Sequence, residues 1–271
     1  MNSAEILLEY VSRHLGALGV QYVVVEPDGT ESEEHVAAYS GFFLTLGDNW
    51  YFVTAGHAFN EKDSGIHELQ KQGRIRVTQC SINDYFRHSA QYISGIPVDF
   101  DSLPIFSVFD QANELDFALI ELRPFYVEAL RANDVRPITD TDLDATHGYP
   151  ELQLRVLGFP DESTVRESGE ESITTWLQPS FVAVERLPHD APLAKAKPKM
   201  IAARILADEL ASPVGLSGGA VFALTRLSDD KTGYWVVGIQ SCWDPNTRTV
   251  YACPIQRAVD IFLDHIEPKT A

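Results

Sequence analysis

Residues 215–224 read GLSGGAVFAL, a glycine-rich turn that runs directly into an apolar stretch of strand character. Ser217 lies between Gly215 and the pair Gly218 and Gly219. Small residues let the backbone bend sharply, and a bent backbone can point several amide hydrogens at one place. The stretch is therefore a candidate for a nucleophilic serine beside an oxyanion hole, the set of amide donors that stabilises a negatively charged reaction intermediate. A plain glycine turn is the alternative interpretation.

Two earlier segments carry the side chains that a nucleophilic serine needs. A serine hydroxyl is a weak nucleophile at neutral pH, so it requires a nearby base whose own position is fixed by an acceptor. His57 ends the segment TAGH after the apolar run WYFV, and Asp116 lies inside the apolar run LDFAL at residues 115–119. An aspartate within such a run must find a partner or shift its pKa. Taken alone, a buried histidine held by hydrogen bonds and an aspartate in a cap or ion pair are the alternatives.

From Val20 onward the chain consists mainly of short runs rich in Val, Ile, Phe and Tyr, separated by turn residues. This pattern predicts many short strands, as in a β-sandwich or a barrel. Apolar residues recur at helical spacing over residues 2–15, and again over residues 255–266 after Pro254. We therefore expect an N-terminal helix in residues 1–17, a first strand-rich unit with His57 and Asp116 in 18–123, a linker in 124–150, and a second strand-rich unit with Ser217 and a C-terminal helix in 151–271.

The order His, Asp, Ser, with each residue in its own sequence context, resembles that of the chymotrypsin-like (trypsin-fold) serine peptidases. The segment GIQSCW at residues 238–243 resembles the strand of this family that binds the substrate backbone, and VYA at 250–252 resembles the strand paired with it. VLGFP at residues 156–160 is similar to the strand that opens the second barrel in bacterial members. The resemblance covers roughly residues 18–267.

The sequence GLSGG also fits the G-x-S-x-G pattern of the α/β-hydrolases. That fold requires a helix after the serine and the order Ser, Asp, His. Here the residues after Ser217 have strand character, and the only histidine beyond it is His265 in the C-terminal helix segment. The α/β-hydrolase interpretation is therefore rejected.

The resemblance implies an all-β fold of two antiparallel six-stranded β-barrels, with the active site in the cleft between them. It implies that Ser217 attacks the substrate carbonyl, that His57 acts as general base and then acid, and that Asp116 orients His57. The N–H groups of Gly215 and Ser217 would form the oxyanion hole. Ser241 matches the family position that lies near these residues and contacts the substrate backbone.

The same resemblance suggests a substrate specificity pocket. Its base would be Ala211, which offers no charge for a Lys or Arg side chain, and its walls would be Trp243 and Thr249. A tryptophan in the wall would narrow the pocket, so we expect a small or medium apolar residue before the cleaved bond.

The chain also departs from the family pattern. Where members activated by cleavage carry an aspartate immediately before the nucleophile, this chain has Leu216. The oxyanion loop must then be held by packing, by a partner or by substrate. Ala58 stands where the family usually has a cysteine, and the three cysteines, Cys80, Cys242 and Cys253, are too few for a disulfide framework. We expect a bacterial-type intracellular member without disulfides.

Charge and composition exclude several other classes of protein. The chain has 39 acidic and 21 basic side chains, a formal charge of −18, which argues against a nucleic-acid partner. Glu5 and Glu9 interrupt the start of the chain where a secretory signal would be basic and then apolar, and no stretch is long enough to span a membrane. The eight histidines form no pair at metal-ligand spacing. We therefore expect a cytoplasmic protein with no membrane partner, no metal and no cofactor, and export by a route without such a signal is the alternative.

The sequence thus predicts a serine endopeptidase that acts on a protein or peptide substrate, with an activating or recruiting protein partner left open. The alternative is a catalytically silent or partner-activated protein of the same fold that binds a peptide or a protein.

Overall fold

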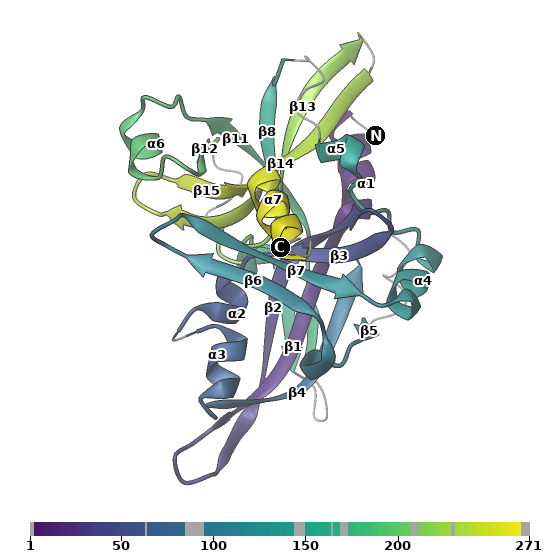
Figure 1. Ribbon diagram of the computed structural model, residues 1–271, viewed down its shortest axis with the longest axis vertical. Coiled ribbons are helices and arrows are strands. Elements are labelled where there is room, and N and C mark those ends of the chain that lie inside the picture. The colour runs from purple at the N-terminus through teal and green to yellow at the C-terminus, as the bar shows by residue number, and fades with distance from the viewer. Residues whose placement is uncertain are drawn as a thin grey trace, which may run out of the picture.

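Two strand-rich units make up the fold of the chain, an open sheet of seven strands and a closed barrel of six (Figure 1). The computed structural model describes residues 3–62, 64–84, 95–143, 150–163, 165–168, 173–206, 210, 212–228 and 231–266. All strand pairs within the two units are antiparallel.

The open sheet has a long curved hairpin at its centre. Gly47, with a φ of +59°, supplies the left-handed backbone that the tight turn between Leu46, the end of one strand, and Asn49, the start of the next, requires. The strand order is β5-β4-β1-β2-β3-β7-β6. The strands are β1 (Leu15–Val25), β2 (Glu31–Leu46), β3 (Asn49–Thr54), β4 (Ile75–Asp84), β5 (Ile96–Pro97), β6 (Ile105–Asp110) and β7 (Leu115–Leu122).

The expectation of a first six-stranded barrel is wrong, because this sheet has seven strands and does not close. Strand β5 contributes only two residues, and Pro97 has no N–H to continue the hydrogen-bond ladder. In the described part of the chain the edge strands β5 and β6 do not pair with each other. Buried apolar side chains of Val98, Phe100 and Leu103 fill the core near this opening instead of a further ladder.

The barrel matches the expected second unit in strand number and closure. Its order is β11-β12-β15-β14-β13-β8, with β8 paired to β11 to close the ring. Its strands are β8 (Gln153–Gly158), β11 (Ser180–Arg186), β12 (Ile201–Ile205), β13 (Ala220–Ser228), β14 (Lys231–Asp244) and β15 (Thr249–Pro254). A separate two-stranded hairpin is formed by β9 (Val165–Ser168) and β10 (Ile173–Trp176).

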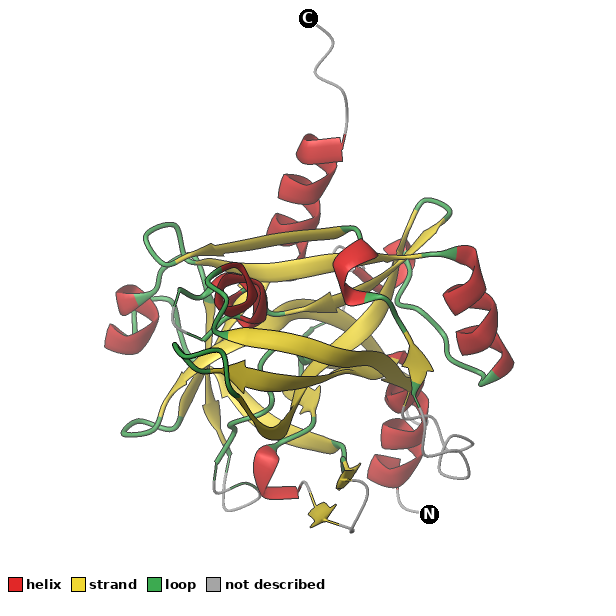
Figure 2. Cartoon of the chain, turned by 90° about the horizontal axis from the view of Figure 1, so that it is seen from below, coloured by secondary structure: helices red, strands yellow, loops and turns green. Residues whose placement is uncertain are grey.

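The helices are short and lie around the outside of the two strand-rich units (Figure 2). They are α1 (Ser3–Val11), η1 (Ser12–His14), α2 (His57–Asn60), α3 (Ile66–Lys71), η3 (Phe100–Ser102), α4 (Pro124–Ala132), α5 (Asp140–Leu143), η5 (Asp161–Ser163), α6 (Pro192–Ala196) and α7 (Ile255–Ile266). None of the helices in the described residues combines the length and the apolar character needed to cross a membrane.

One of the two terminal helices has the bounds that the sequence pattern predicts, and the other ends earlier. Helix α7 covers the range expected from its periodicity. At the N-terminus, in contrast, the helical turns end at His14 and strand β1 begins at Leu15, inside the segment expected to be helical. Leu15 is fully buried and pairs with Phe42 of β2, so sheet pairing outweighs the local helical pattern there.

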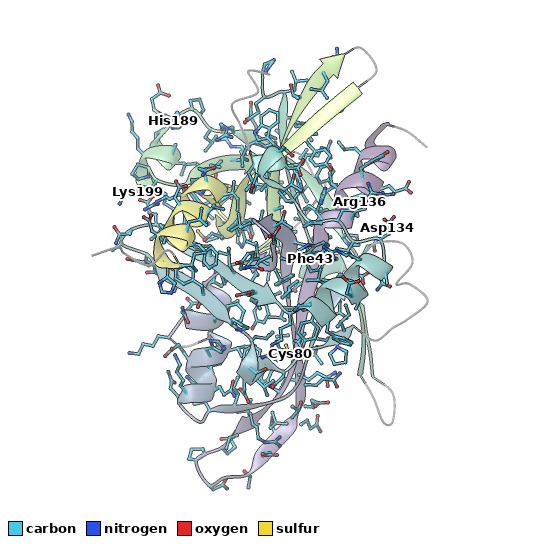
Figure 3. The ribbon with its side chains drawn as sticks, turned by 45° about the vertical axis from the view of Figure 1, so that its right-hand side comes forward. Phe43, Cys80, Asp134, Arg136, His189 and Lys199 are labelled. Atoms are coloured by element: carbon cyan, nitrogen blue, oxygen red, sulfur yellow. The ribbon has the colours of Figure 1, made fainter. Side chains whose placement is uncertain are left out.

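The apolar core has one part inside each unit and one part between them. Phe43 packs edge-on against Phe52, with ring centroids 5.7 Å apart, inside the open sheet, where Cys80 is also buried (Figure 3). We call the part between the units the seam. Its members include Phe42, Tyr51, Val53 and Phe117 of the sheet, Leu157, Phe222 and Ile239 of the barrel, and Val259 and Phe262 of α7. The seam fixes the sheet against the barrel and so positions the site that lies at its edge.

Candidate active site

His57 is held at the first residue of helix α2 by Asp116. Strand β3 ends at Thr54, and the chain passes through Gly56, where a Cβ would lie 2.1 Å from the carbonyl oxygen of Val108. Only glycine allows this close approach, which sets the start of the helix. The backbone N–H of His57 donates to Asp116 Oδ1 at 2.8 Å, and His57 Nδ1 lies 2.8 Å from Asp116 Oδ2.

This pairing assigns the proton positions of the imidazole ring. A carboxylate can only accept hydrogen bonds, so Nδ1 carries the hydrogen and Nε2 is left with its lone pair. Burial by itself lowers the pKa of His57, but the hydrogen bond and the negative charge of Asp116, with a contribution from Glu61, raise the pKa above its ordinary value. His57 is therefore a strengthened base whose free nitrogen is Nε2.

Asp116 lies at the second residue of β7 and is almost completely buried, with 2% of its surface exposed. Besides the two bonds from His57, its Oδ2 accepts a hydrogen bond from the hydroxyl of Ser241. Burial alone raises the pKa of the Asp116 carboxyl, but the hydrogen bonds and charge of His57 and the bond from Ser241 outweigh it and hold the pKa below its usual range. The carboxylate therefore stays ionised and keeps His57 oriented.

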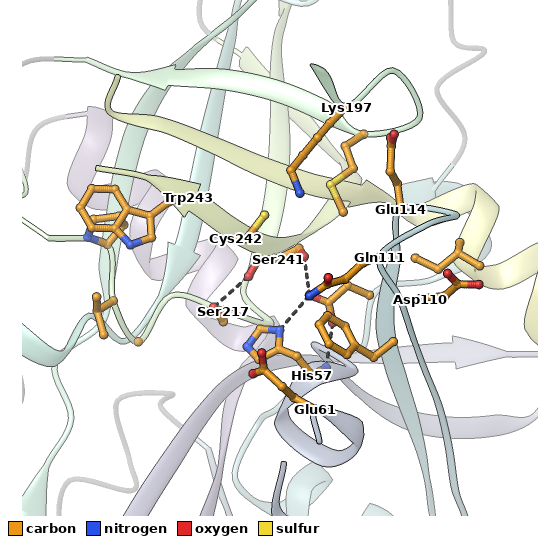
Figure 4. Close-up of a pocket in the computed structure, with 17 residues that line it drawn as sticks. His57, Glu61, Asp110, Gln111, Glu114, Lys197, Ser217, Ser241, Cys242 and Trp243 are labelled. Atoms are coloured by element: carbon orange, nitrogen blue, oxygen red, sulfur yellow. Dashed lines mark hydrogen bonds and ion pairs between the residues drawn. The ribbon is translucent and has the colours of Figure 1, made fainter. Parts of the chain in front are cut away.

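Ser217 lies in the glycine-rich turn that leads into β13, in the same cleft as His57. Its Oγ donates to the backbone carbonyl of Ser241 at 3.0 Å (Figure 4). The described residues show no hydrogen bond between this hydroxyl and His57. A rotation about the Cα–Cβ bond of Ser217 is the movement that would carry the hydroxyl from the Ser241 carbonyl toward the ring.

The turn before Ser217 points the N–H of Gly215 toward the cleft. Leu216 N–H donates to the Pro213 carbonyl at 3.0 Å, and Gly215 has a φ of +91°, which makes residues 213–216 a type II turn. The Val214 carbonyl turns away from the cleft to accept a bond from Asp161 N–H at 2.8 Å. Because the N–H and C=O of one trans peptide point in opposite directions, the Gly215 N–H faces the cleft side.

Neither that N–H nor the N–H of Ser217 has a hydrogen-bond acceptor among the described residues. A concave site with two unpaired amide donors beside a serine hydroxyl is the arrangement that stabilises an oxyanion.

The cleft has a volume of about 650 Å³ and contains most of the residues that the sequence marked for the site. Figure 4 shows Trp243 toward one end and Asp110 and Glu114 toward the other, with His57 and Ser217 between them. The lining residues are His57, Glu61, Phe109, Asp110, Gln111, Glu114, Leu115, Asp116, Lys197, Met200, Pro213, Val214, Gly215, Ser217, Ser241, Cys242 and Trp243.

The expected specificity pocket is only partly represented among these residues. Trp243 lines the cleft, as expected for a wall residue. Thr249 is fully buried in β15 and is not among the described residues that line the cleft, and Ala211 lies outside the described residues. The sequence patterns did not point to Phe109, whose ring lies edge-on to His57 with centroids 6.0 Å apart, or to Lys197.

One of the three cysteines, Cys242, lines the cleft. Cys80, Cys242 and Cys253 are free thiols. Within the described parts of the chain there is no group of three or more His, Cys, Asp or Glu side chains that could hold a metal ion.

The chain is similar to solved structures of proteases. The protease Anisep from Arthrobacter nicotinovorans is 15% identical over 92% of this chain and 94% of its own, with a TM-score of 0.46. The thermostable serine protease AL20 from an extremophilic microorganism is 11% identical over 94% of this chain and 99% of its own, with a TM-score of 0.48. A catalytically inactive tobacco etch virus protease in complex with substrate is 12% identical over 91% of this chain and 80% of its own, with a TM-score of 0.40.

All three are described as proteases, and one of them as a serine protease. No protein-family model matches the sequence, and no curated protein sequence matches it significantly.

Proposed function

We propose that the chain is a serine endopeptidase in which Ser217 is the nucleophile, His57 the general base and acid, and Asp116 the group that orients His57. One observation carries this proposal. A buried carboxylate accepts both the ring N–H and the backbone N–H of His57, in the same cleft as Ser217, whose own N–H and that of Gly215 have no acceptor among the described residues. These are the parts that acyl transfer by a serine requires.

In the first half of the reaction, Ser217 Oγ attacks the carbonyl carbon of a peptide bond while its proton passes to His57 Nε2. The electron pair of the C=O bond moves onto oxygen, and the N–H groups of Gly215 and Ser217 donate to this oxyanion. Asp116 stabilises the positively charged ring. The C–N bond then breaks, the leaving amine takes the proton from Nε2, and the acyl group remains as an ester on Ser217.

In the second half, water replaces the amine. It loses a proton to His57 Nε2 and attacks the ester carbon, and the C–O bond to Ser217 breaks as Nε2 returns the proton to Oγ. The products are two peptides, and all of the groups regain their starting protonation states. The reaction requires no cofactor.

The cleft supports a polypeptide substrate with an apolar side chain before the cleaved bond. Trp243, Val214 and Pro213 supply apolar surface on the side of the cleft near the oxyanion turn, and the bulk of Trp243 favours a small or medium residue. The three free thiols support a reducing, cytoplasmic location.

A second candidate function rests on the position of the Ser217 hydroxyl. It donates to the Ser241 carbonyl and not to His57, which is compatible with a site that becomes active only when a substrate or partner turns the hydroxyl toward the ring. In this case the chain would be a partner-activated protease or a silent binder of a peptide or protein.

Labelling with a fluorophosphonate probe tests the proposal without knowledge of the substrate. The probe reacts with a serine only when a base activates it, so intact mass should show one adduct on the wild type and none on Ser217→Ala or His57→Ala. Ser102→Ala removes an exposed hydroxyl from η3 and serves as the matched control, which should label like the wild type. A folded wild type that takes no adduct would favour the second candidate, and an adduct on Ser217→Ala would refute the assignment of the nucleophile.

A further inference from the structure

The oxyanion turn, which we define as residues 213–216, needs contacts that keep its backbone in the type II form. The Gly215 N–H within the turn and the Ser217 N–H after it have no acceptor among the described residues, so no described hydrogen bond holds these two groups from the cleft side. Gly215 tolerates either hand of the backbone, and the peptide between Val214 and Gly215 could therefore flip and remove one donor from the hole. Whatever keeps the turn in its type II form must act from the side away from the cleft.

Besides the local bonds that Leu216 and Val214 make with Gly219 and Ser212, two hydrogen bonds reach the Val214 and Gly215 carbonyls from more distant parts of the chain. One is the bond from Asp161 N–H to the Val214 carbonyl, described above. The other comes from the open sheet, where Ser40 of β2 donates its hydroxyl hydrogen to the carbonyl of Gly215 at 2.6 Å. Ser40 lies 175 positions before Gly215 in the chain, so this bond connects the sheet directly to the barrel side of the site.

The geometry around Ser40 fixes the direction of its hydroxyl. The Phe159 N–H donates to Ser40 Oγ at 2.8 Å, and because an N–H can only donate, the hydroxyl uses its own hydrogen for Gly215. Phe159 is the second residue before Asp161, the partner of Val214. One hydroxyl thus joins the oxyanion turn to the segment that holds the Val214 carbonyl of the same turn.

Close packing leaves no room for water to replace this hydroxyl. Ser40 is 1% exposed, and a Cβ on Gly158 would lie 3.0 Å from its Oγ. A Cβ on Gly218 would lie 2.2 Å from the Ser40 carbonyl oxygen, which itself accepts a bond from Thr54 Oγ1 at 2.7 Å. Removing the hydroxyl would therefore take away its hydrogen bonds to the Gly215 carbonyl and from the Phe159 N–H, which is costly at a buried site.

We propose that Ser40 is a positioning residue that holds the oxyanion turn in its type II form from the neighbouring sheet, so that the hole is formed before substrate binds. Leu216, which is 1% exposed and packs in the barrel core, has no charge with which to fix the turn, and the Ser40 hydroxyl supplies the contact instead. The effect on catalysis rests on the proposed function, whereas the effect on the turn does not.

The test compares Ser40→Ala with a matched control in the same strand. Thr45 of β2 also donates its hydroxyl to a backbone carbonyl, that of Ile138 at 3.2 Å, but it makes no contact with the turn. Thr45→Val removes that bond without changing the size of the side chain. Ser40→Cys keeps a weaker donor at the site, so it serves as a second variant should Ser40→Ala fold poorly.

Nuclear magnetic resonance can observe the turn itself. The sequence contains two Val-Gly pairs, Val214–Gly215 and Val237–Gly238, so labelling valine carbonyls with ¹³C and glycine amides with ¹⁵N selects two amide signals. Gly238 lies in β14, away from Ser40, and provides the internal reference. In a type II turn the Val214 Hα lies close to the Gly215 amide hydrogen and gives a strong Overhauser effect, which a flipped peptide loses.

We expect Ser40→Ala to weaken this Overhauser effect and to shift or split the Gly215 signal, while Gly238 stays in place. In peptide cleavage we expect kcat to fall by about 10-fold to 100-fold with KM nearly unchanged, because an oxyanion donor acts mainly in the transition state. The kcat and the Gly215 Overhauser effect of Ser40→Cys should lie between those of Ser40→Ala and the wild type. Thr45→Val should match the wild type in both measurements.

Two results would separate the failure of this inference from the failure of the proposed function. A Gly215 signal and Overhauser effect unchanged in Ser40→Ala, with kcat equal to that of Thr45→Val, would overturn the role of Ser40. A wild type that neither cleaves peptides nor takes the fluorophosphonate would refute the proposed function, and the Gly215 measurement would then decide the role of Ser40 by itself.

Discussion

Replacing Asp116 by Asn tests how the base is held. The carboxylate accepts three hydrogen bonds, from the backbone N–H of His57 on Oδ1 and from His57 Nδ1–H and the Ser241 hydroxyl on Oδ2. An amide has one accepting oxygen. If that oxygen stays opposite the backbone N–H, the NH₂ group faces Nδ1, which must then accept. The ring hydrogen moves to Nε2, and His57 can no longer take the proton of Ser217.

The expected fall in kcat follows from the loss of the correct tautomer of the His57 ring. Changing this acceptor in a serine triad costs on the order of 10⁴-fold in kcat. Four factors of ten at about 1.36 kcal/mol each raise the barrier by roughly 5.4 kcal/mol. The negative charge that raises the pKa of His57 against the effect of burial is lost as well, which weakens the base further. KM should change little, because Ser217 and the oxyanion turn are not altered.

The assay is steady-state cleavage of a peptide found in a library screen, with the rate of fluorophosphonate labelling as a second measure. Asp110→Asn is the matched control, since it removes one carboxylate charge from the same cleft without contacting His57. We expect this control to stay within a few-fold of the wild type. A folded Asp116→Asn variant that retains more than a tenth of wild-type kcat would refute the role of Asp116.

Two further predictions concern pH. The labelling rate of Ser217 should rise with pH through the folded-state pKa of His57, since only the neutral ring accepts a proton. Burial lowers this pKa but Asp116 raises it more, so the midpoint should lie above the ordinary 6.5, and a midpoint at or below that value would contradict the pairing. At His14, burial lowers the pKa from 6.5, and its ring nitrogens contact the Arg136 carbonyl at 2.7 Å and the Tyr234 hydroxyl at 2.8 Å. The unfolded chain therefore binds a proton more readily, so stability is retained above pH 6.5 and is lost as the pH falls from there toward the lower folded value. Urea unfolding should show that the free energy of unfolding falls less between pH 7 and pH 5.5 for His14→Gln than for the wild type. An equal fall in the two proteins would exclude His14 as the cause.

The residues of the candidate site could be selected from the sequence because each of them stands in a distinctive local context. An aspartate inside an apolar strand, a histidine after a strand and a serine among glycines can each be recognised within a few residues of chain. The structure brings His57, Asp116, Ser217 and Gly215 into one cleft. The strands of the closed barrel were predictable from their apolar runs and turn residues, whereas closure into a six-stranded barrel was implied by the resemblance to the chymotrypsin-like peptidases.

The features that the sequence did not reveal depend on contacts between distant residues. Ser40 has no local signal, because its partners Phe159 and Gly215 lie 119 and 175 positions away. The opening of the first sheet depends on the two-residue strand β5, which is too short to give a periodic pattern. The start of β1 at Leu15 was obscured because three preceding residues continue the helical spacing before the chain pairs with β2.

The seam has a consequence for how the protein responds to temperature. His57 and Asp116 belong to the sheet, whereas Ser217 and Ser241 belong to the barrel, so the site exists only while the two units stay in register. Aromatic contacts such as that between Tyr51 and Phe262, with centroids 5.1 Å apart, maintain this register. A displacement of about 1 Å between catalytic groups can cost about 100-fold in rate, while it leaves the strands intact. Loss of activity on heating therefore reports the loosening of the seam, whereas circular dichroism reports the later melting of the strands. Adaptation to a hotter or colder habitat would act first on the aromatic residues between the units.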